Sequence, residues 1–164
     1  MGVTFKSILL IYFISVTCLG LVYGQQLESF SLEDLEGDWQ TLEDLKGEKA
    51  TVVDFWATWC KPCVKAMPKL DELYENLSDK GLGVIGISCD GPRSVGKINP
   101  VINSMAINYP ILKDIDCEVM NAHEFQAFPT LVLLDADGKI TWVHEGFKSG
   151  DEHEIEKQVM ELLK

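Results

Sequence analysis

Two cysteines, Cys60 and Cys63, stand two residues apart, directly after a run of strand-forming residues at 50–57. Such a pair can contribute to a zinc site, form a structural disulfide, or exchange electrons as a dithiol. Structural zinc needs four ligands, usually a second cysteine pair or two histidines three to five residues apart. The other cysteines are isolated, and none of the histidines is so spaced: His123, His144 and His153. The sequence therefore predicts no metal site.

A structural role for the pair is weak on physical grounds. A bridge from Cys60 to Cys63 closes a very small loop and so removes little entropy from the unfolded chain. In contrast, Cys60 falls where the strand gives way to a helix, and free amides at a helix start stabilise a thiolate. Lys61 adds a cation, and Pro62 suits the first helical turn. We therefore expect Cys60 to be an exposed nucleophile and Cys63, one turn further along, to be a shielded resolving thiol.

The elements around the pair predict a βαβ unit. Residues 50–57 are apolar on both faces except at Asp54, which is typical of a buried central strand. Apolar residues then recur at steps of three and four over 64–77, as on one face of a helix. A second strand is expected at 82–88. The order strand, helix, strand predicts an α/β domain with parallel neighbours.

The rest of the chain is interpreted from its turns and periodicities. An N-terminal hairpin is expected to turn at Gly37, and the Asp-Gly pair at 137–138 predicts a second hairpin. Residues 90–109 are a polar insert interrupted by Pro100, where a short or broken helix is expected. The other expected elements are a strand at 111–112, a helix at 116–125, strands at 130–134 and 140–144, and a helix at 152–163.

Length and charge limit the class of protein. The 164 residues suffice for one domain, and the net charge of −12 argues against a nucleic-acid partner, which would need a basic face. Near the N-terminus, Lys6 precedes an apolar run at 8–22, which is short for a membrane span and typical of a signal peptide. We expect a signal peptide at 1–24 and a domain at 25–164. The alternatives are an uncleaved membrane anchor or lipidation at Cys18.

The cysteine pair lies in a longer motif that resembles a known family. Residues 53–63 read VDFWATWCKPC, and with Pro68 they resemble the active-site strand and helix of thioredoxins. The N-terminal segment, the stretch at 37–42 and the insert at 90–113 make the chain similar to the extracytoplasmic TlpA-like and ResA-like thiol–disulfide oxidoreductases. The similarity covers nearly all of residues 27–164. It implies a thioredoxin fold: a central mixed sheet flanked by helices, an N-terminal β-hairpin, and an insert after the second core strand.

The resemblance implies several substrate-binding residues. Pro129 matches the cis-proline that lies across from the dithiol and exposes the backbone of Phe128 to an extended substrate. Trp59 is expected to cover the dithiol and contact partners, next to Lys61 and Pro62. Lys61 departs from the glycine of cytosolic thioredoxins. We expect it to make Cys60 more acidic and the pair more oxidising.

Four further residues are considered separately. Asp54 matches the buried acid of thioredoxins; burial should raise its pKa, which suits a proton acceptor for Cys63. Cys89 and Cys117 each follow a predicted strand end, on the edge where the active site of an α/β sheet lies. They could form a structural disulfide, remain free thiols, or supply one resolving cysteine; the disulfide is the interpretation we favour. Asp90 receives no role.

The implied activity is thiol–disulfide exchange, with no organic cofactor. Cys60 attacks a disulfide of an extracytoplasmic protein, in the periplasm or outside the cell, and Cys63 resolves the intermediate. The resemblance implies a membrane thiol-reductase as electron donor and cytochrome c maturation as the commonest use. The alternatives are a disulfide-forming oxidase or isomerase, a thiol peroxidase, and a non-catalytic binding module. A peroxidase would carry a Pro-x-x-x-Thr-x-x-Cys motif, which Cys60 lacks.

Overall fold

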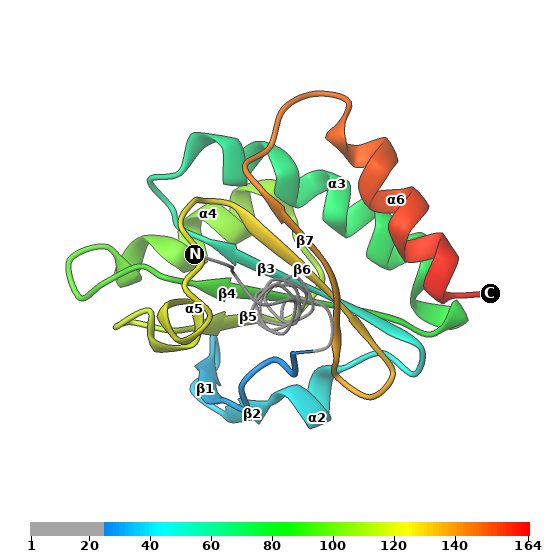
Figure 1. The fold of residues 1–164 in the computed structure, drawn as a ribbon. Coiled ribbons are helices and arrows are strands. Elements are labelled where there is room, and N and C mark those ends of the chain that lie inside the picture. The colour runs from blue at the N-terminus through cyan, green and yellow to red at the C-terminus, as the bar shows by residue number, and fades with distance from the viewer. Residues whose placement is uncertain (1–24) are drawn as a thin grey trace, which may run out of the picture.

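Strand β3 (Ala50–Trp56) lies inside a seven-stranded sheet, between β4 and β6, in the computed structural model, which describes residues 25–164 (Figure 1). The strand order is β2-β1-β5-β4-β3-β6-β7. The other strands are β1 (Ser31–Asp34), β2 (Trp39–Thr41), β4 (Leu82–Ser88), β5 (Ile111–Lys113), β6 (Thr130–Asp135) and β7 (Ile140–Glu145). The helices are α2 (Leu42–Leu45), α3 (Lys61–Leu77), α4 (Ile98–Met105), α5 (Glu118–Ala122) and α6 (Asp151–Leu162), with 3-10 turns η1 (Ser78–Lys80) and η2 (Val95–Lys97).

The sheet is mixed, as the sequence predicts. Strand β3 is parallel to β4 and antiparallel to β6, and β4 is parallel to β5. The hairpin β1–β2 turns at Gly37, whose φ of +95° favours glycine, and it joins the sheet through antiparallel pairing with β5. The insert after β4 contains the short helix α4. The expected hairpin, mixed sheet and insert are therefore confirmed.

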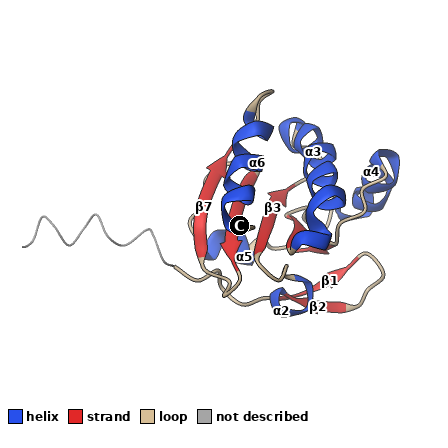
Figure 2. Ribbon diagram, turned by 90° about the vertical axis from the view of Figure 1, so that its right-hand side faces the viewer, coloured by secondary structure: helices blue, strands red, loops and turns tan. Residues whose placement is uncertain are grey.

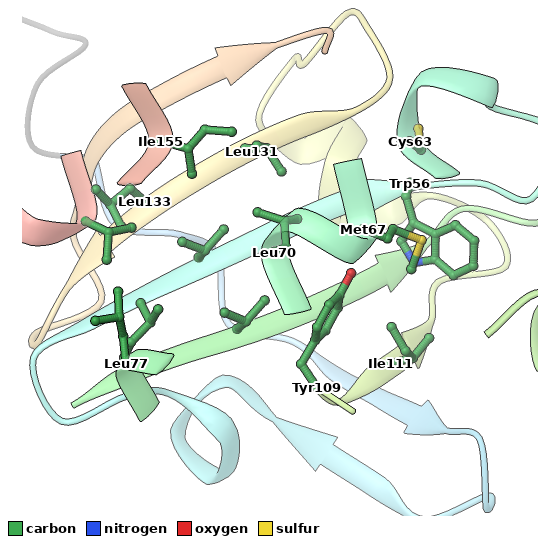
Figure 3. Packing of buried hydrophobic residues seen from close by; sticks show 14 of the residues in the cluster. Trp56, Cys63, Met67, Leu70, Leu77, Tyr109, Ile111, Leu131, Leu133 and Ile155 are labelled. Atoms are coloured by element: carbon green, nitrogen blue, oxygen red, sulfur yellow. The ribbon is translucent and has the colours of Figure 1, made fainter. Parts of the chain in front are cut away.

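Each face of the sheet is covered by its own helices. Alternation along β3 directs Val52, Asp54 and Trp56 to the face packed against α3, α4 and α6, while Val53 and Phe55 face α2 and α5. Figure 3 shows the first of these clusters, where the side chains of α3 lie over the strands. Figure 2 shows α3 and α6 next to each other on that face. Each fully buried large apolar side chain contributes about 1.5–3 kcal/mol.

Helix α5 is shorter than the helix expected at 116–125. Cys117 precedes it with φ +54°, and Glu124 follows it with φ +56°, and neither conformation can continue a right-handed helix. The carboxylate of Asp114 accepts hydrogen bonds from the backbone amides of Glu118 and Val119, at 2.9 and 3.0 Å, and so fixes the helix start.

The described chain begins beside the β6–β7 turn. The backbone amide of Ile140 donates to the carbonyl of Gln25 at 2.9 Å, and the amide of Leu27 donates to the carbonyl of Gly138 at 3.3 Å. The signal peptide, anchor and lipidation expectations concern residues 1–24 and lie outside the described residues. Within residues 25–164, no helix combines the length and apolarity needed to cross a bilayer.

Candidate active site

Cys60 and Cys63 lie at the junction between β3 and α3. Cys60 is the N-cap of α3, and its Sγ accepts a hydrogen bond from the backbone amide of Cys63 at 3.2 Å. The two residues are joined by a disulfide, with their Cα atoms 5.3 Å apart. Cys63 has no exposed surface and Cys60 is 4% exposed. Cys60 is thus less exposed than the sequence suggests, because in this oxidised state its sulfur is bonded inward to Cys63.

The first turn of α3 carries positive rather than negative charge. It contains no acidic residue; Lys61 is its exposed cation and Pro62 occupies one of its first positions. A helix start already has a partial positive charge from its free amides. Lys61 adds to that charge, so the environment of Cys60 favours a thiolate once the disulfide is reduced.

Asp54 is a buried acid without a partner. Its side chain has no exposed surface, and neither carboxyl oxygen has a hydrogen-bond partner among residues 25–164. Burial raises the pKa of Asp54 to about 8. The residue faces α3, the helix that carries Cys63. At neutral pH this carboxyl group therefore holds a proton mostly, and it can give up or take back that proton near neutral pH.

Two further polar groups lie on the same face, and no sequence pattern predicted them as part of the site. Tyr109 Oη and Trp56 Nε1 are buried and have no hydrogen-bond partner among the described residues. Burial raises the pKa of Tyr109 well above its usual value, and the charges of Asp54 and Asp71 add to this effect. Gly86 pairs with Asp54 in the sheet. A Cβ there would lie 2.6 Å from Cδ1 of Ile111, 3.1 Å from the ring of Tyr109 and 3.3 Å from Trp56 Nε1. Glycine at this position thus leaves room for Ile111 and for the two aromatic rings beside β3.

Asp90 anchors the loop that leads to the dithiol. Its carboxylate is 1% exposed and accepts hydrogen bonds from the backbone amide and hydroxyl of Thr58, both at 2.7 Å. The hydroxyl of Ser88 donates to the same carboxylate at 2.9 Å. Because Thr58 lies two residues before Cys60, Asp90 fixes the backbone approach to the nucleophile. The sequence contained no signal for this role beyond an acid following a strand.

The peptide bond between Phe128 and Pro129 is cis. Trp59, which is 62% exposed, packs edge-to-face against Phe128 with ring centroids 5.3 Å apart. This contact brings the Phe128–Pro129 bond next to the residue that precedes Cys60. The carbonyl of Pro129 accepts a hydrogen bond from the amide of Gly146 at 2.7 Å, which ties this segment to the loop after β7.

Cys89 and Cys117 form a second pair in disulfide contact, with Cα atoms 5.0 Å apart. Cys89 directly follows β4, and its amide donates to the carbonyl of Trp56 at 2.8 Å. Cys117 directly precedes α5. A structural role for this pair stays a prediction. Across residues 25–164, no three His, Cys, Asp or Glu side chains are grouped as a metal site would require.

The sequence of this chain is similar to those of known proteins. Residues 23–143 match the AhpC/TSA family. The thiol–disulfide oxidoreductase ResA of Halalkalibacterium halodurans is 31% identical over 141 residues, covering 86% of this chain and 77% of that protein. The thioredoxin-like protein YneN of Bacillus subtilis is 35% identical over 138 residues, covering 83% of this chain and 79% of YneN.

A solved structure agrees with the same assignment. The thioredoxin domain of a thiol–disulfide oxidoreductase from Bacteroides vulgatus has a TM-score of 0.72 and 26% identity, covering 88% of this chain and all of that one. The thioredoxin fold expected from the sequence is therefore confirmed. This chain belongs to the AhpC/TSA family, and within that family it is related to the thiol–disulfide oxidoreductase ResA.

Proposed function

We propose that this protein reduces disulfide bonds of extracytoplasmic proteins through Cys60 and Cys63. The observation that carries the proposal is the position of this pair. A cysteine at the N-cap of α3 is bonded to a fully buried cysteine one turn further, and the sheet face beneath α3 holds an acid that has no hydrogen-bond partner within residues 25–164. A helix start favours the thiolate, and the buried acid supplies a proton site. Both properties favour thiol–disulfide exchange, and neither is needed for a structural bridge.

The reaction starts from the reduced pair. The thiolate of Cys60 attacks one sulfur of the substrate disulfide, that S–S bond breaks, and the leaving sulfur takes a proton. Cys60 is then joined to the substrate by a mixed disulfide. Cys63 loses its proton and attacks the sulfur of Cys60, which releases the second substrate thiol. Two electrons have passed to the substrate, and the protein is left with the Cys60–Cys63 bridge.

Asp54 serves as the proton site for Cys63 in both directions of the cycle. In the oxidised protein Asp54 is protonated, because burial holds its pKa at about 8. When a donor reduces the bridge, Asp54 can protonate the departing sulfur of Cys63. The resulting carboxylate is then in place to accept that proton again when Cys63 resolves the mixed disulfide.

The substrate lies against Trp59 and the cis peptide segment. The backbone of Phe128 is offered to an extended substrate chain, and the exposed ring of Trp59 covers one side of the same place. Lys61 and Pro62 are exposed at the start of α3 and complete this surface.

The compartment is proposed from the N-terminal segment. The apolar run at 8–22 supports export, with residues 1–24 either removed or retained as a membrane tether. The protein then works in the periplasm or outside the cell, on disulfide-containing proteins such as those processed during cytochrome c maturation. A thiol-reductase of the membrane supplies the electrons, since the oxidised pair must be reduced again after each turnover.

Insulin reduction followed by turbidity tests the proposal, with dithiothreitol as electron source. We expect the wild type to be active and Cys60→Ser to be inactive, while Cys63→Ser accumulates the mixed disulfide. An inactive wild type would leave only the non-catalytic binding module, and consumption of hydrogen peroxide at the expense of insulin would favour the peroxidase. The reduction potential decides direction: a value typical of disulfide-forming oxidases would replace the reductase with an oxidase.

A further inference from the structure

A hollow of about 590 Å³ lies next to the dithiol, between the first half of α3 and the loop joining β7 to α6. Figure 1 shows that loop rising beside α3. Four of the lining residues are lysines, and one is an acid, Glu152. The chain as a whole has 26 acidic and 14 basic residues, so four positive charges in one hollow depart from its general character. We call this hollow the lysine groove: it is lined by Lys61, Lys65, Lys69 and Lys148, with Phe147 as an apolar wall.

Three of the lysines form one stripe along α3. Lys61, Lys65 and Lys69 follow each other at steps of four, which places them on a single helix face. Like charges at this spacing destabilise a helix, and positive charge near a helix start opposes its dipole. Helix α6 of the same protein follows the usual rule, with three acids in its first turn. The stripe on α3 thus costs stability, and such departures are typical of functional surfaces.

Most of these charges have no acidic partner. Lys69 pairs with Glu72 at 3.0 Å. Within the described part of the chain, no carboxylate lies within 4 Å of the amino group of Lys61, Lys65 or Lys148. All three side chains are exposed. Their charges are therefore available to a partner molecule.

The loop between β7 and α6, which forms one wall of the lysine groove, is held in place by hydrogen bonds. The amide of Lys148 donates to Asp151 Oδ2 at 2.9 Å, and His144 Nε2 lies 3.1 Å from the same oxygen. At its other end, the amide of Gly146 donates to the carbonyl of Pro129 at 2.7 Å. The groove wall is therefore continuous with the cis-proline segment. Phe147, which lines the groove, follows Gly146 directly, so the groove begins one residue from this contact with Pro129.

We propose that the lysine groove binds an acidic segment of the substrate protein that flanks the disulfide to be reduced. The inference rests on the proposed reductase function and adds its substrate class. The groove takes no part in the transfer of electrons or protons. It raises the encounter rate and holds the acidic segment so that the neighbouring disulfide meets Cys60.

Three synthetic peptides test the proposal. Each contains the same Cys-x-x-Cys disulfide, flanked on both sides by four aspartates, four serines or four lysines. The reduced full-length protein is mixed with each peptide, and second-order rates are measured by acid quench and mass spectrometry. At low salt the wild type should reduce the aspartate peptide about tenfold faster than the lysine peptide. In 1 M NaCl, where the Debye length is about 3 Å, the three rates should converge.

The variant Lys65→Glu/Lys148→Glu reverses two charges of the groove. Its ratio of aspartate to serine rates should fall about tenfold relative to the wild type. Lys80→Glu/Lys139→Glu is the matched control: it makes the same change of charge at two exposed lysines outside the groove, and it should keep the wild-type ratio.

The outcomes separate the groove from the reductase activity. An unchanged ratio of rates in the groove variant overturns the proposal. An equal loss of rate on all three peptides, together with a raised thiol pKa of Cys60, also overturns it, because the lysines would then act on the nucleophile alone. If the ratio falls equally in the control variant, the effect comes from the net charge of the protein and not from the groove, and the proposal is also overturned. If the wild type reduces none of the peptides, the reductase function itself fails and the inference falls with it.

Discussion

Replacing Asp54 by asparagine should change how the stability of the oxidised protein depends on pH. The side chain keeps its shape but can no longer ionise. In the native protein burial raises the pKa of Asp54 from 3.8 to about 8. Below about pH 4 the folded and unfolded chains both hold the proton. Between pH 4 and 8 the folded protein keeps it and the unfolded chain does not, so rising pH favours the unfolded state.

The size of the effect follows from this difference in bound protons. The folded protein binds about one proton more, so its free energy of unfolding falls by about 1.4 kcal/mol for each pH unit in this range. Between pH 5 and pH 7 the loss that Asp54 causes amounts to about 2–3 kcal/mol. The loss is complete above about pH 8, where both states are ionised. Asp54→Asn removes this contribution and leaves those of all other groups.

Urea denaturation followed by circular dichroism measures the effect at pH 5, 6, 7 and 8. The quantity compared is the free energy of unfolding of Asp54→Asn minus that of the wild type. Packing differences of the amide shift this quantity equally at all pH values, so the rise with pH isolates the ionisation. We expect it to grow by about 2–3 kcal/mol from pH 5 to pH 7. A flat difference would mean that Asp54 ionises as an ordinary carboxyl group, and it would refute both the raised pKa and the proton role assigned to it.

Two other changes probe the surroundings of the nucleophile. Lys61→Gly should raise the thiol pKa of Cys60 and make the pair more reducing, measured as the reduction potential against glutathione; no shift, or a shift toward more oxidising values, would contradict the role of Lys61. Asp90→Ala removes the acceptor of three hydrogen bonds around Thr58. It should lower the free energy of unfolding by about 3 kcal/mol in urea denaturation and also slow thiol–disulfide exchange. A variant as stable and fast as the wild type would show that the loop does not need this anchor.

The sequence predicts those parts of the site that are coded locally. The strand and helix around Cys60 and Cys63 follow from patterns within about thirty residues, because burial and periodicity act on neighbouring positions. The surroundings of Asp54 do not follow in this way. Tyr109 lies far along the chain and comes to the same face only through the insert and β5, with space provided by Gly86.

The same limit applies to the lysine groove and to the loop anchor. The stripe of lysines on α3 is visible in the spacing of the sequence, but Lys148 joins it only because the loop after β7 is tied back to Pro129. Asp90 reaches Thr58 across 32 positions, through the ends of two paired strands. Tertiary contacts of this kind depend on the whole sheet, so no local pattern of residues predicts them.

The hydrogen bond between Gln25 and Ile140 determines where the described chain enters the domain. It holds the start of that chain at the β6–β7 turn, near Asp135, which pairs with the first residue of β3. Cys60 follows the far end of that seven-residue strand, about 23 Å away along its length. A tether joined at residue 25 therefore leaves the domain from the pole opposite the dithiol. On a membrane, the reactive end would point away from the lipid, and the domain itself would act as the spacer that lets a bulky client approach.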